Sequence, residues 1–212
     1  MASSIIHMAV ASELNKKLKK DNKSILIGSI APDISKQIDK SKLKSHFQNN
    51  DNDIPDLNKF LASYKSDLED DFVLGYYIHL YTDYIWFKYF ITDYIKNTCV
   101  YDINNNKLHL SDEERIDYIY NDYTNLNIKV IDRYNLELNI FYEEHPNFKN
   151  IIKEIPMDKI NIIIEKTGLI IENSKETKSI LFDLTSITRF IDFCVKVIID
   201  DLKNLGIYKV LQ

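Results

Sequence analysis

Hydrophobic residues recur at the three- and four-residue spacing of an α-helix along most of this chain. Ile6, Val10, Leu14 and Leu18 follow one another at intervals of four, and Ser4 before them is a good N-cap, so a first helix is expected from residue 4 to about residue 20. Similar patterns predict further helices at about 55–68, 71–97, 111–134, 157–174 and 185–205. The chain is therefore expected to form an all-α fold of about six or seven helices.

Residues that cap and end helices support part of this assignment. Ser111 and Glu114 have the spacing of a capping box, and Gly206 is a suitable C-terminal stop for the last helix. The segments 98–109 and 140–150 do not continue the helical pattern and are expected to hold extended pieces.

The apolar segment 24–34 is expected to be a short helix that Pro32 ends, because a proline disfavours helical angles in the residue before it. Asp33 would then lie in an irregular stretch just after a buried element. Residues 35–53 lack any periodicity and are expected to form a long loop around His46. Loops of that length in a compact domain are often functional.

Composition adds a size and a charge to this picture. No shift in composition divides the 212 residues, so residues 1–212 are expected to form a single helical domain. Only four glycines and four prolines are present, which disfavours a turn-rich β fold. The formal net charge is −5 and the basic residues are scattered, so binding to long nucleic acid is not expected. The oligomeric state is left open.

The N-terminal segment MASSIIHMAVASEL lacks the basic start and the apolar run of a signal peptide. No stretch reaches the roughly 18 to 20 apolar residues of a transmembrane segment. Cys99 and Cys194 have no metal-type spacing and form no disulfide framework. A cytoplasmic location is therefore expected.

The predicted helix 71–97 contains one histidine and one aspartate in a strongly aromatic run. His79 and Asp83 are four residues apart, so both side chains lie on one face of that helix and reach the same point inside the bundle. A buried carboxylate without a counter-charge would cost several kcal/mol. We therefore expect a positive partner, either a divalent metal or a lysine, an arginine or a protonated histidine.

Three further residues favour the metal. Asp33 follows a buried segment, His46 lies thirteen residues later, and His7 lies in the first helix. Together with His79 and Asp83 they supply three imidazoles and two carboxylates, a mixed nitrogen and oxygen set that suits zinc.

The ordered series of His7, Asp33 in GSIAPDIS, His46 in KSHF and the His79-x-x-x-Asp83 pair resembles the zinc-dependent phospholipase C family, which is related to the S1/P1 nucleases. The resemblance covers roughly residues 1 to 95. It implies an all-α fold of the phospholipase C/P1 nuclease type. It also implies that Asp33, His46 and His79 bind one zinc ion, that Asp83 bridges to a second, and that His7 holds this second ion.

In this family the N-terminal residue also binds the second ion through its free amine and carbonyl. Met1 is followed by the small residue Ala2, which normally permits removal of the initiator methionine, and Ala2 lies five residues before His7. The resemblance therefore makes Ala2 a possible additional ligand. This sequence differs from the family pattern in two respects. The family's terminal residue is typically a tryptophan that cleavage of a signal peptide exposes, and the sequence here begins with Met1. The alternative is a frayed terminus.

The family holds a third zinc with a histidine after the His-x-x-x-Asp segment and a later His-x-x-x-Glu or His-x-x-x-Asp pair. His109 and Glu113 have that spacing, but Ser111 is expected to cap the helix and leave His109 outside it, and no histidine follows shortly after Asp83. Two zinc ions are therefore expected, with a third at His109 and Glu113 as the less favoured possibility. His145 is expected to be a surface loop residue.

The resemblance and the donor set together predict a zinc-dependent hydrolase of phosphoric esters. Two metal ions lower the pKa of bound water and hold the oxygens of the ester, and Asp33 at the edge of the site is the candidate catalytic residue that orients or deprotonates the water. The expected substrate is a small phosphodiester or other phosphoester, or a lipid headgroup. The alternative is a non-catalytic helical protein in which a structural metal site, or no metal, stabilises the N-terminal half.

Overall fold

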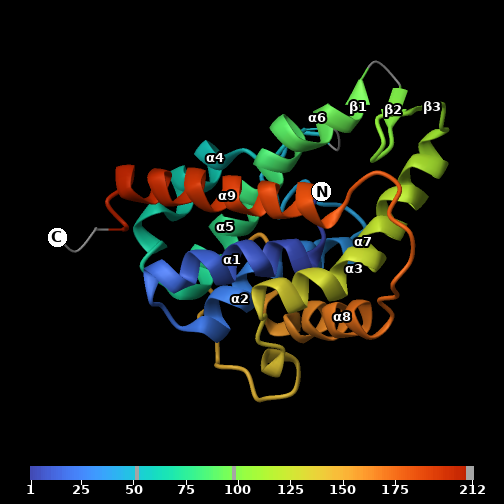
Figure 1. Ribbon diagram of the computed structural model, residues 1–212. Helices are drawn as coiled ribbons and strands as arrows, with labels where there is room; N and C mark the ends of the chain where they lie inside the picture. Colours follow the sequence, from blue (N-terminus) through green and yellow to red (C-terminus); the bar gives the residue numbers. More distant parts are fainter. Residues whose placement is uncertain (51–52, 97–98, 209–212) are drawn as a thin grey trace.

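The computed structural model describes residues 1–50, 53–96 and 99–208, and helices dominate throughout them (Figure 1). The α-helices are α1 (Ser4–Leu18), α2 (Asn22–Ile30), α3 (Ile34–Ile38), α4 (Leu57–Tyr64), α5 (Asp71–Ile85), α6 (Ile91–Tyr94), α7 (Asp112–Tyr134), α8 (Asn161–Glu172) and α9 (Leu184–Asn204). Short 3-10 turns lie at Ala31–Asp33, Lys65–Asp67, Asn139–Phe141 and Met157–Lys159. The expected all-α class is confirmed.

One small antiparallel sheet interrupts the helices. Its strands are β1 (Ile95–Lys96), β2 (Cys99–Tyr101) and β3 (Lys107–Leu108), and Val100 of β2 is paired with Ile95 of β1 and with Leu108 of β3. Extended structure within 98–109 is thus confirmed for the described part, since residues 97–98 lie outside it. The prediction for 140–150 is wrong, because the described backbone there contains the end of a 3-10 turn followed by irregular structure and no strand.

Most helix ends follow the local sequence. Ser111 and Glu114 form the expected capping box, with the Glu114 N–H donating to Ser111 Oγ at 3.2 Å. Gly206 follows α9 with a φ of 79°, a conformation that glycine adopts without strain. The cap of α1 differs by one position, because the hydroxyl of Ser3 and not that of Ser4 accepts from the N–H of Ile6 at 3.3 Å.

Pro32 does not end the helical segment. It lies at the start of the 3-10 turn that follows α2, where its missing N–H would have had no helical partner, and the chain then continues directly into α3. Asp33 therefore lies at a helical junction and not in an irregular stretch. The predicted loop 35–53 is also shorter at its start, since α3 runs to residue 38, and residues 51–52 lie outside the described part.

The single helix expected over 71–97 is broken. α5 ends at Ile85, the segment Trp86–Phe90 is a π-helix, and α6 then leads into β1. Packing against α9 accounts for the change, because the rings of Trp86 and Phe90 lie 5.1 and 4.9 Å from the ring of Phe190. Tertiary contacts of large aromatic side chains thus override the regular helix that the sequence pattern favours.

The core lies where α5 crosses α2, with α1 and α9 packed around them (Figure 1). Gly28 of α2 and Gly75 of α5 face each other so closely that a Cβ on Gly28 would lie 2.3 Å from the Phe72 carbonyl oxygen, and a Cβ on Gly75 would lie 2.3 Å from the Ile25 oxygen. The two backbones therefore meet directly, which brings the residues that follow Gly75 on α5 against α1 and α2.

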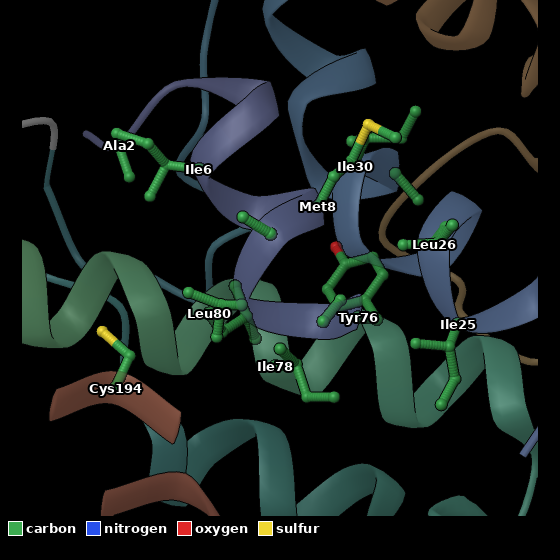
Figure 2. Close-up of a cluster of buried hydrophobic side chains, with 14 of the residues drawn as sticks. Ala2, Ile6, Met8, Ile25, Leu26, Ile30, Tyr76, Ile78, Leu80 and Cys194 are labelled. Carbon is green, nitrogen blue, oxygen red and sulfur yellow. The ribbon is translucent and has the colours of Figure 1, made fainter. Parts of the chain in front are cut away.

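Figure 2 shows apolar side chains of this region, among them Leu80 of α5, Ile6 and Met8 of α1, Leu26 and Ile30 of α2, and Cys194 of α9. Within the described residues, no helix is both long enough and apolar enough to cross a bilayer.

Candidate metal centre

The five residues predicted to bind metal converge inside the helical bundle. His7 comes from α1, Asp33 from the 3-10 turn after α2, His46 from the turn after α3, and His79 and Asp83 from α5. The side chains of all except Asp33 are fully buried, and the Asp33 side chain is 15% exposed. Residues separated by up to 76 positions (83 minus 7) are thus brought to one point.

Their donor atoms lie within a few ångströms of one another. Nε2 of His7 is 3.3 Å from Oδ1 of Asp83, and Nε2 of His46 is 3.1 Å from Nε2 of His79. Nε2 of His46 and Nε2 of His79 lie 3.6 and 3.7 Å from Oδ2 of Asp83, and 3.7 and 3.9 Å from Oδ1 of Asp33.

Two groups of three potential ligands follow from these distances. His7, His79 and Asp83 form one group, and Asp33, His46 and His79 form the other, with the ligand atoms of each group within 4.8 Å of one another. His79 is common to both groups. The face shared by His79 and Asp83 on α5, expected from their four-residue spacing, is confirmed.

Contacts of the outer ring nitrogens orient two of the three imidazoles, those of His79 and His46. Nδ1 of His79 lies 2.7 Å from the carbonyl oxygen of Ser29, which can only accept, so the proton is on Nδ1 and the lone pair of Nε2 faces the centre. Nδ1 of His46 lies 2.9 Å from the hydroxyl of Ser45, whose own carbonyl accepts from Tyr76 at 2.6 Å. Such second contacts are typical of metal-binding histidines.

Three buried polar atoms of the cluster have no hydrogen-bond partner among the described residues: Nδ1 and Nε2 of His7, and Oδ2 of Asp83. Unpartnered buried polar atoms are uncommon and costly in folded proteins. Nε2 of His46 and Nε2 of His79 lie 3.6 and 3.7 Å from Oδ2 of Asp83, which is too far for a hydrogen bond. A cation bound by Nε2 of His7 and Oδ2 of Asp83 would satisfy these two atoms together, so they fit a metal ion, whereas Nδ1 of His7 would still lack a partner among the described residues.

The electrostatic environment suits metal ligands. Burial lowers the pKa of His79 well below its ordinary value and lowers that of His46 as well, so both imidazoles stay neutral and can use their lone pairs. Burial would raise the pKa of Asp83, but the imidazoles of His7 and its neighbours outweigh burial and hold that pKa well below its usual range. An ionised carboxylate and neutral imidazoles are the forms that bind metal.

Lys42 is the residue of the centre that the sequence did not single out. Its ammonium contacts Oδ1 of Asp33 and the sulfur of Met1, and its side chain is only 11% exposed. Burial raises the pKa of Asp33, but Lys42, followed by the three imidazoles, lowers it by more. Lys42 thus provides one of the positive partners anticipated for a buried carboxylate, although at Asp33 and not at Asp83.

The start of the chain is ordered against the same cluster. The backbone N–H of Ala2 donates to Oδ1 of Asp83 at 3.0 Å, and the carbonyl oxygen of Met1 accepts from the hydroxyl of Tyr123. Ala2 is buried, and burial lowers the pKa of the Met1 amine to about 6. The alternative of a frayed terminus is therefore wrong, and the nitrogen of Ala2 lies beside the group formed by His7, His79 and Asp83.

The residues considered for a third ion lie elsewhere. His109 is exposed between β3 and α7, and Glu113 is exposed in the first turn of α7. Neither belongs to a group of possible metal ligands in the described part of the chain. His145 is half-buried in the irregular stretch before α8 and is likewise outside both groups.

A cleft opens beside the centre on the side of Asp33. It has a volume of about 690 Å³ and is lined by residues 1–4, by Asp33, Lys36 and Lys42, and by faces of α7 and α8. Because Asp33 and Ala2 belong both to the cleft and to the cluster, a molecule in the cleft can reach the ligand group of Asp33.

Comparisons with protein-family models, with curated proteins and with solved structures give no match. The geometry gives a buried cluster of three histidines and two aspartates beside a cleft, in which two overlapping groups of three side chains could each hold a metal ion.

Proposed function

We propose that this protein is a zinc-dependent hydrolase of phosphoric esters that uses two metal ions. The observation that carries the proposal is the convergence of His7, Asp33, His46, His79 and Asp83 into two overlapping ligand groups beside an open cleft. A nitrogen and oxygen donor set of this kind suits zinc. The arrangement agrees with the roles that the resemblance to the zinc-dependent phospholipase C family implies.

The accessibility of one ligand favours catalysis over a purely structural metal. Structural zinc sites are closed by four protein ligands, whereas catalytic sites keep a position for water or substrate. Four of the five side chains here are fully buried, but Asp33 lines the cleft. A phosphoester in the cleft can thus approach the ligand group of Asp33, His46 and His79.

Bound divalent ions would supply Lewis acidity and lower the pKa of a coordinated water into the neutral range. Asp33, at the boundary between centre and cleft, orients the attacking water and accepts its proton. Asp83 contacts all three imidazoles and so fixes the two ligand groups relative to each other. Ser29 and Ser45 hold the rings of His79 and His46 in place.

Ala2 is the proposed additional ligand at the group of His7 and Asp83. Its nitrogen is already 3.0 Å from Oδ1 of Asp83 as a backbone amide. If Met1 is removed, that nitrogen becomes a free amine at the same place, and an amine is a far better metal ligand than an amide. Intact-mass measurement on the purified protein establishes which residue is terminal.

The test is hydrolysis of chromogenic phosphate esters by the zinc-loaded protein. Asp33→Asn and His79→Ala are expected to lower kcat/KM for p-nitrophenyl phosphate or its bis ester by about 100-fold or more, since each removes a ligand or the proton acceptor. His109→Ala is the matched control, because His109 is an exposed histidine outside both ligand groups, and it is expected to retain activity. Full activity in both site variants would refute the proposal. Two bound zinc ions without turnover would favour a structural site.

A further inference from the structure

The cleft beside the metal centre has two chemically different walls. The part of its lining around Asp33 carries the positive side chains of Lys36 and Lys42, and Lys166 of α8 is also on the lining. Among the described residues that line it, Asp33 is the single carboxylate. The chain as a whole has a net charge of −5, whereas lysines outnumber carboxylates in this cleft. The local positive charge favours an anionic ligand.

The wall that α7 and α8 form is largely apolar, although Thr124, Asn127, Lys166 and Asn173 also belong to it. Ile116, Ile119, Tyr120 and Tyr123 lie at successive steps of three, one and three along α7, and Ile163 and Ile170 lie seven apart on α8. These side chains are not all needed for the core. Ile116 is 51% exposed and Tyr120 is 50% exposed, and both line the cleft.

The two walls are connected at Tyr120. Its hydroxyl accepts a hydrogen bond from Nζ of Lys36 at 2.8 Å, and the same ammonium lies 5.6 Å from the centre of the Tyr120 ring. The anion-binding end and the apolar wall therefore form a single surface. A ligand that uses both must carry its negative charge at one end and an apolar group at the other.

The number of charges favours a dianion. A phosphodiester carries one negative charge, whereas a phosphomonoester carries between one and a half and about two at neutral pH, because its second pKa is about 6. Lys42 is paired with Asp33, but a cation bound by Asp33 would repel that ammonium and leave it to face the cleft with Lys36. Lys36, Lys42 and a divalent cation bound at Asp33 would together place several positive charges around the phosphate. This positive charge is balanced better by the dianionic monoester than by the monoanionic diester.

We infer that the cleft binds the phosphate monoester of an apolar alcohol, with the phosphate between Lys36, Lys42 and Asp33 and the alcohol against the α7–α8 wall of Ile116, Tyr120 and Ile163. This inference rests on the proposed function for the chemical step. In that step water adds to phosphorus and the bond between phosphorus and the alcohol oxygen breaks. The proton that Asp33 accepts from the water passes to the oxygen of the leaving alcohol, and inorganic phosphate is the second product.

Binding of non-hydrolysable alkylphosphonates tests the ligand class without turnover. Calorimetry on the zinc-loaded protein would compare ethyl-, butyl- and octylphosphonate, and each methylene that is buried strengthens binding by up to about fourfold. Because the wall is open to solvent on one side, we expect octylphosphonate to bind at least roughly tenfold more tightly than ethylphosphonate. The monomethyl ester of octylphosphonate, which carries one charge, is expected to bind several-fold more weakly than octylphosphonate.

Variants assign the effect to the cleft. Ile116→Asn is expected to remove most of the dependence on chain length, while Leu169→Asn is its matched control, because Leu169 is 52% exposed on α8 and does not line the cleft. Lys36→Gln is expected to weaken all phosphonates by a similar factor, with Lys196→Gln, an exposed lysine of α9, as its control. Equal affinity for all chain lengths, or the same loss in Leu169→Asn as in Ile116→Asn, would overturn the inference.

The result separates this inference from the proposed function. Hydrolysis of p-nitrophenyl phosphate that depends on His79, without any chain-length dependence of phosphonate binding, would leave the function standing and exclude this ligand class. Binding of phosphonates that depends on chain length, without any hydrolysis, would support this ligand class and refute the proposed hydrolase function. Binding to vesicles that contain phosphatidic acid, as well as to soluble octylphosphonate, would identify a lipid as the source of the monoester.

Discussion

Asp83→Asn removes one charge from the middle of the centre while keeping the shape of the side chain. Asp83 is fully buried, and its oxygens lie 3.3, 3.6 and 3.7 Å from the nearest Nε2 atoms of His7, His46 and His79. An amide in this place is a poor metal ligand and leaves the cation without its shared negative partner. If this is a metal centre, the variant must lose affinity for zinc.

The size of the loss follows from known metal sites. Mutation of a residue that merely orients a ligand already weakens binding by about 10- to 100-fold, so the loss of a charged ligand is expected to cost at least about 100-fold. Zinc at 100 times its Kd stabilises a folded protein by about 2.7 kcal/mol, which after a 100-fold loss of affinity falls to about 0.4 kcal/mol. For a chain of this length 1 kcal/mol corresponds to about 2–4 °C in Tm. The zinc-induced shift should therefore be about 5–11 °C in the wild type and only about 1 °C in the variant.

The assay is thermal unfolding followed by circular dichroism, at equal free zinc and again with chelator. The difference between the two conditions is compared, so any change in the stability of the metal-free fold cancels. Asp122→Asn is the matched control. Asp122 is an equally buried carboxylate, but it accepts backbone N–H groups of Ile180, Leu181 and Phe182 and takes no part in either ligand group.

Asp122→Asn is expected to lower Tm with zinc and with chelator alike, and so to keep the wild-type shift. A wild-type zinc-induced shift in Asp83→Asn would refute the assignment of Asp83 as a ligand. An equal loss of the shift in both aspartate variants would show that the effect comes from general damage to the fold.

Three further predictions use other parts of the structure. Lys42→Gln should tighten zinc binding by about tenfold or more, measured by competition with a chromogenic chelator, because the ammonium beside Asp33 repels a divalent cation; unchanged or weaker binding would contradict this. Without metal, the free energy of unfolding should fall as the pH drops below about 6.5, because the unfolded chain takes up a proton that the buried His79 refuses. In urea titrations His79→Gln should lessen that slope by about 1.4 kcal/mol per pH unit, and an unaltered slope would exclude the buried neutral imidazole. Gly75→Ala should destabilise the fold by about 3 kcal/mol or more, because its Cβ would lie 2.3 Å from a backbone oxygen of α2. Gly168→Ala, whose Cβ meets nothing nearer than 3.8 Å, should change stability by less than about 1 kcal/mol, and equal effects in the two variants would argue against the close helix crossing.

The parts of the fold that local sequence determines were predictable. The capping box at Ser111, the stop at Gly206 and the shared face of His79 and Asp83 depend on spacings of a few residues, and all three are confirmed. The errors arise where distant contacts decide the structure. Phe190 of α9 packs against the aromatic residues of the π-helix that follows α5, and it lies 104 positions (190 minus 86) after Trp86 in the sequence.

The centre shows the same division. Its two carboxylates and three imidazoles could be selected because such residues are rare in a helical core and expensive to bury. Lys42 could not be selected, since it is one of several lysines in an aperiodic segment and only the folding of that segment brings it to Asp33. Nor could the apolar wall of the cleft be assigned, because hydrophobic residues on α7 and α8 have the same spacing whether they face the core or a ligand.

Zinc stoichiometry tests the central claim most directly. Protein purified without chelator would be dialysed against a defined concentration of free zinc, and the bound metal would be measured by elemental analysis alongside the His79→Ala variant. Two equivalents per chain are predicted for the wild type and at most one for the variant, because Nε2 of His79 is the ring nitrogen that faces the centre and it can bind one ion. A wild-type protein that binds no zinc, or a variant that still binds two equivalents, would contradict the claim.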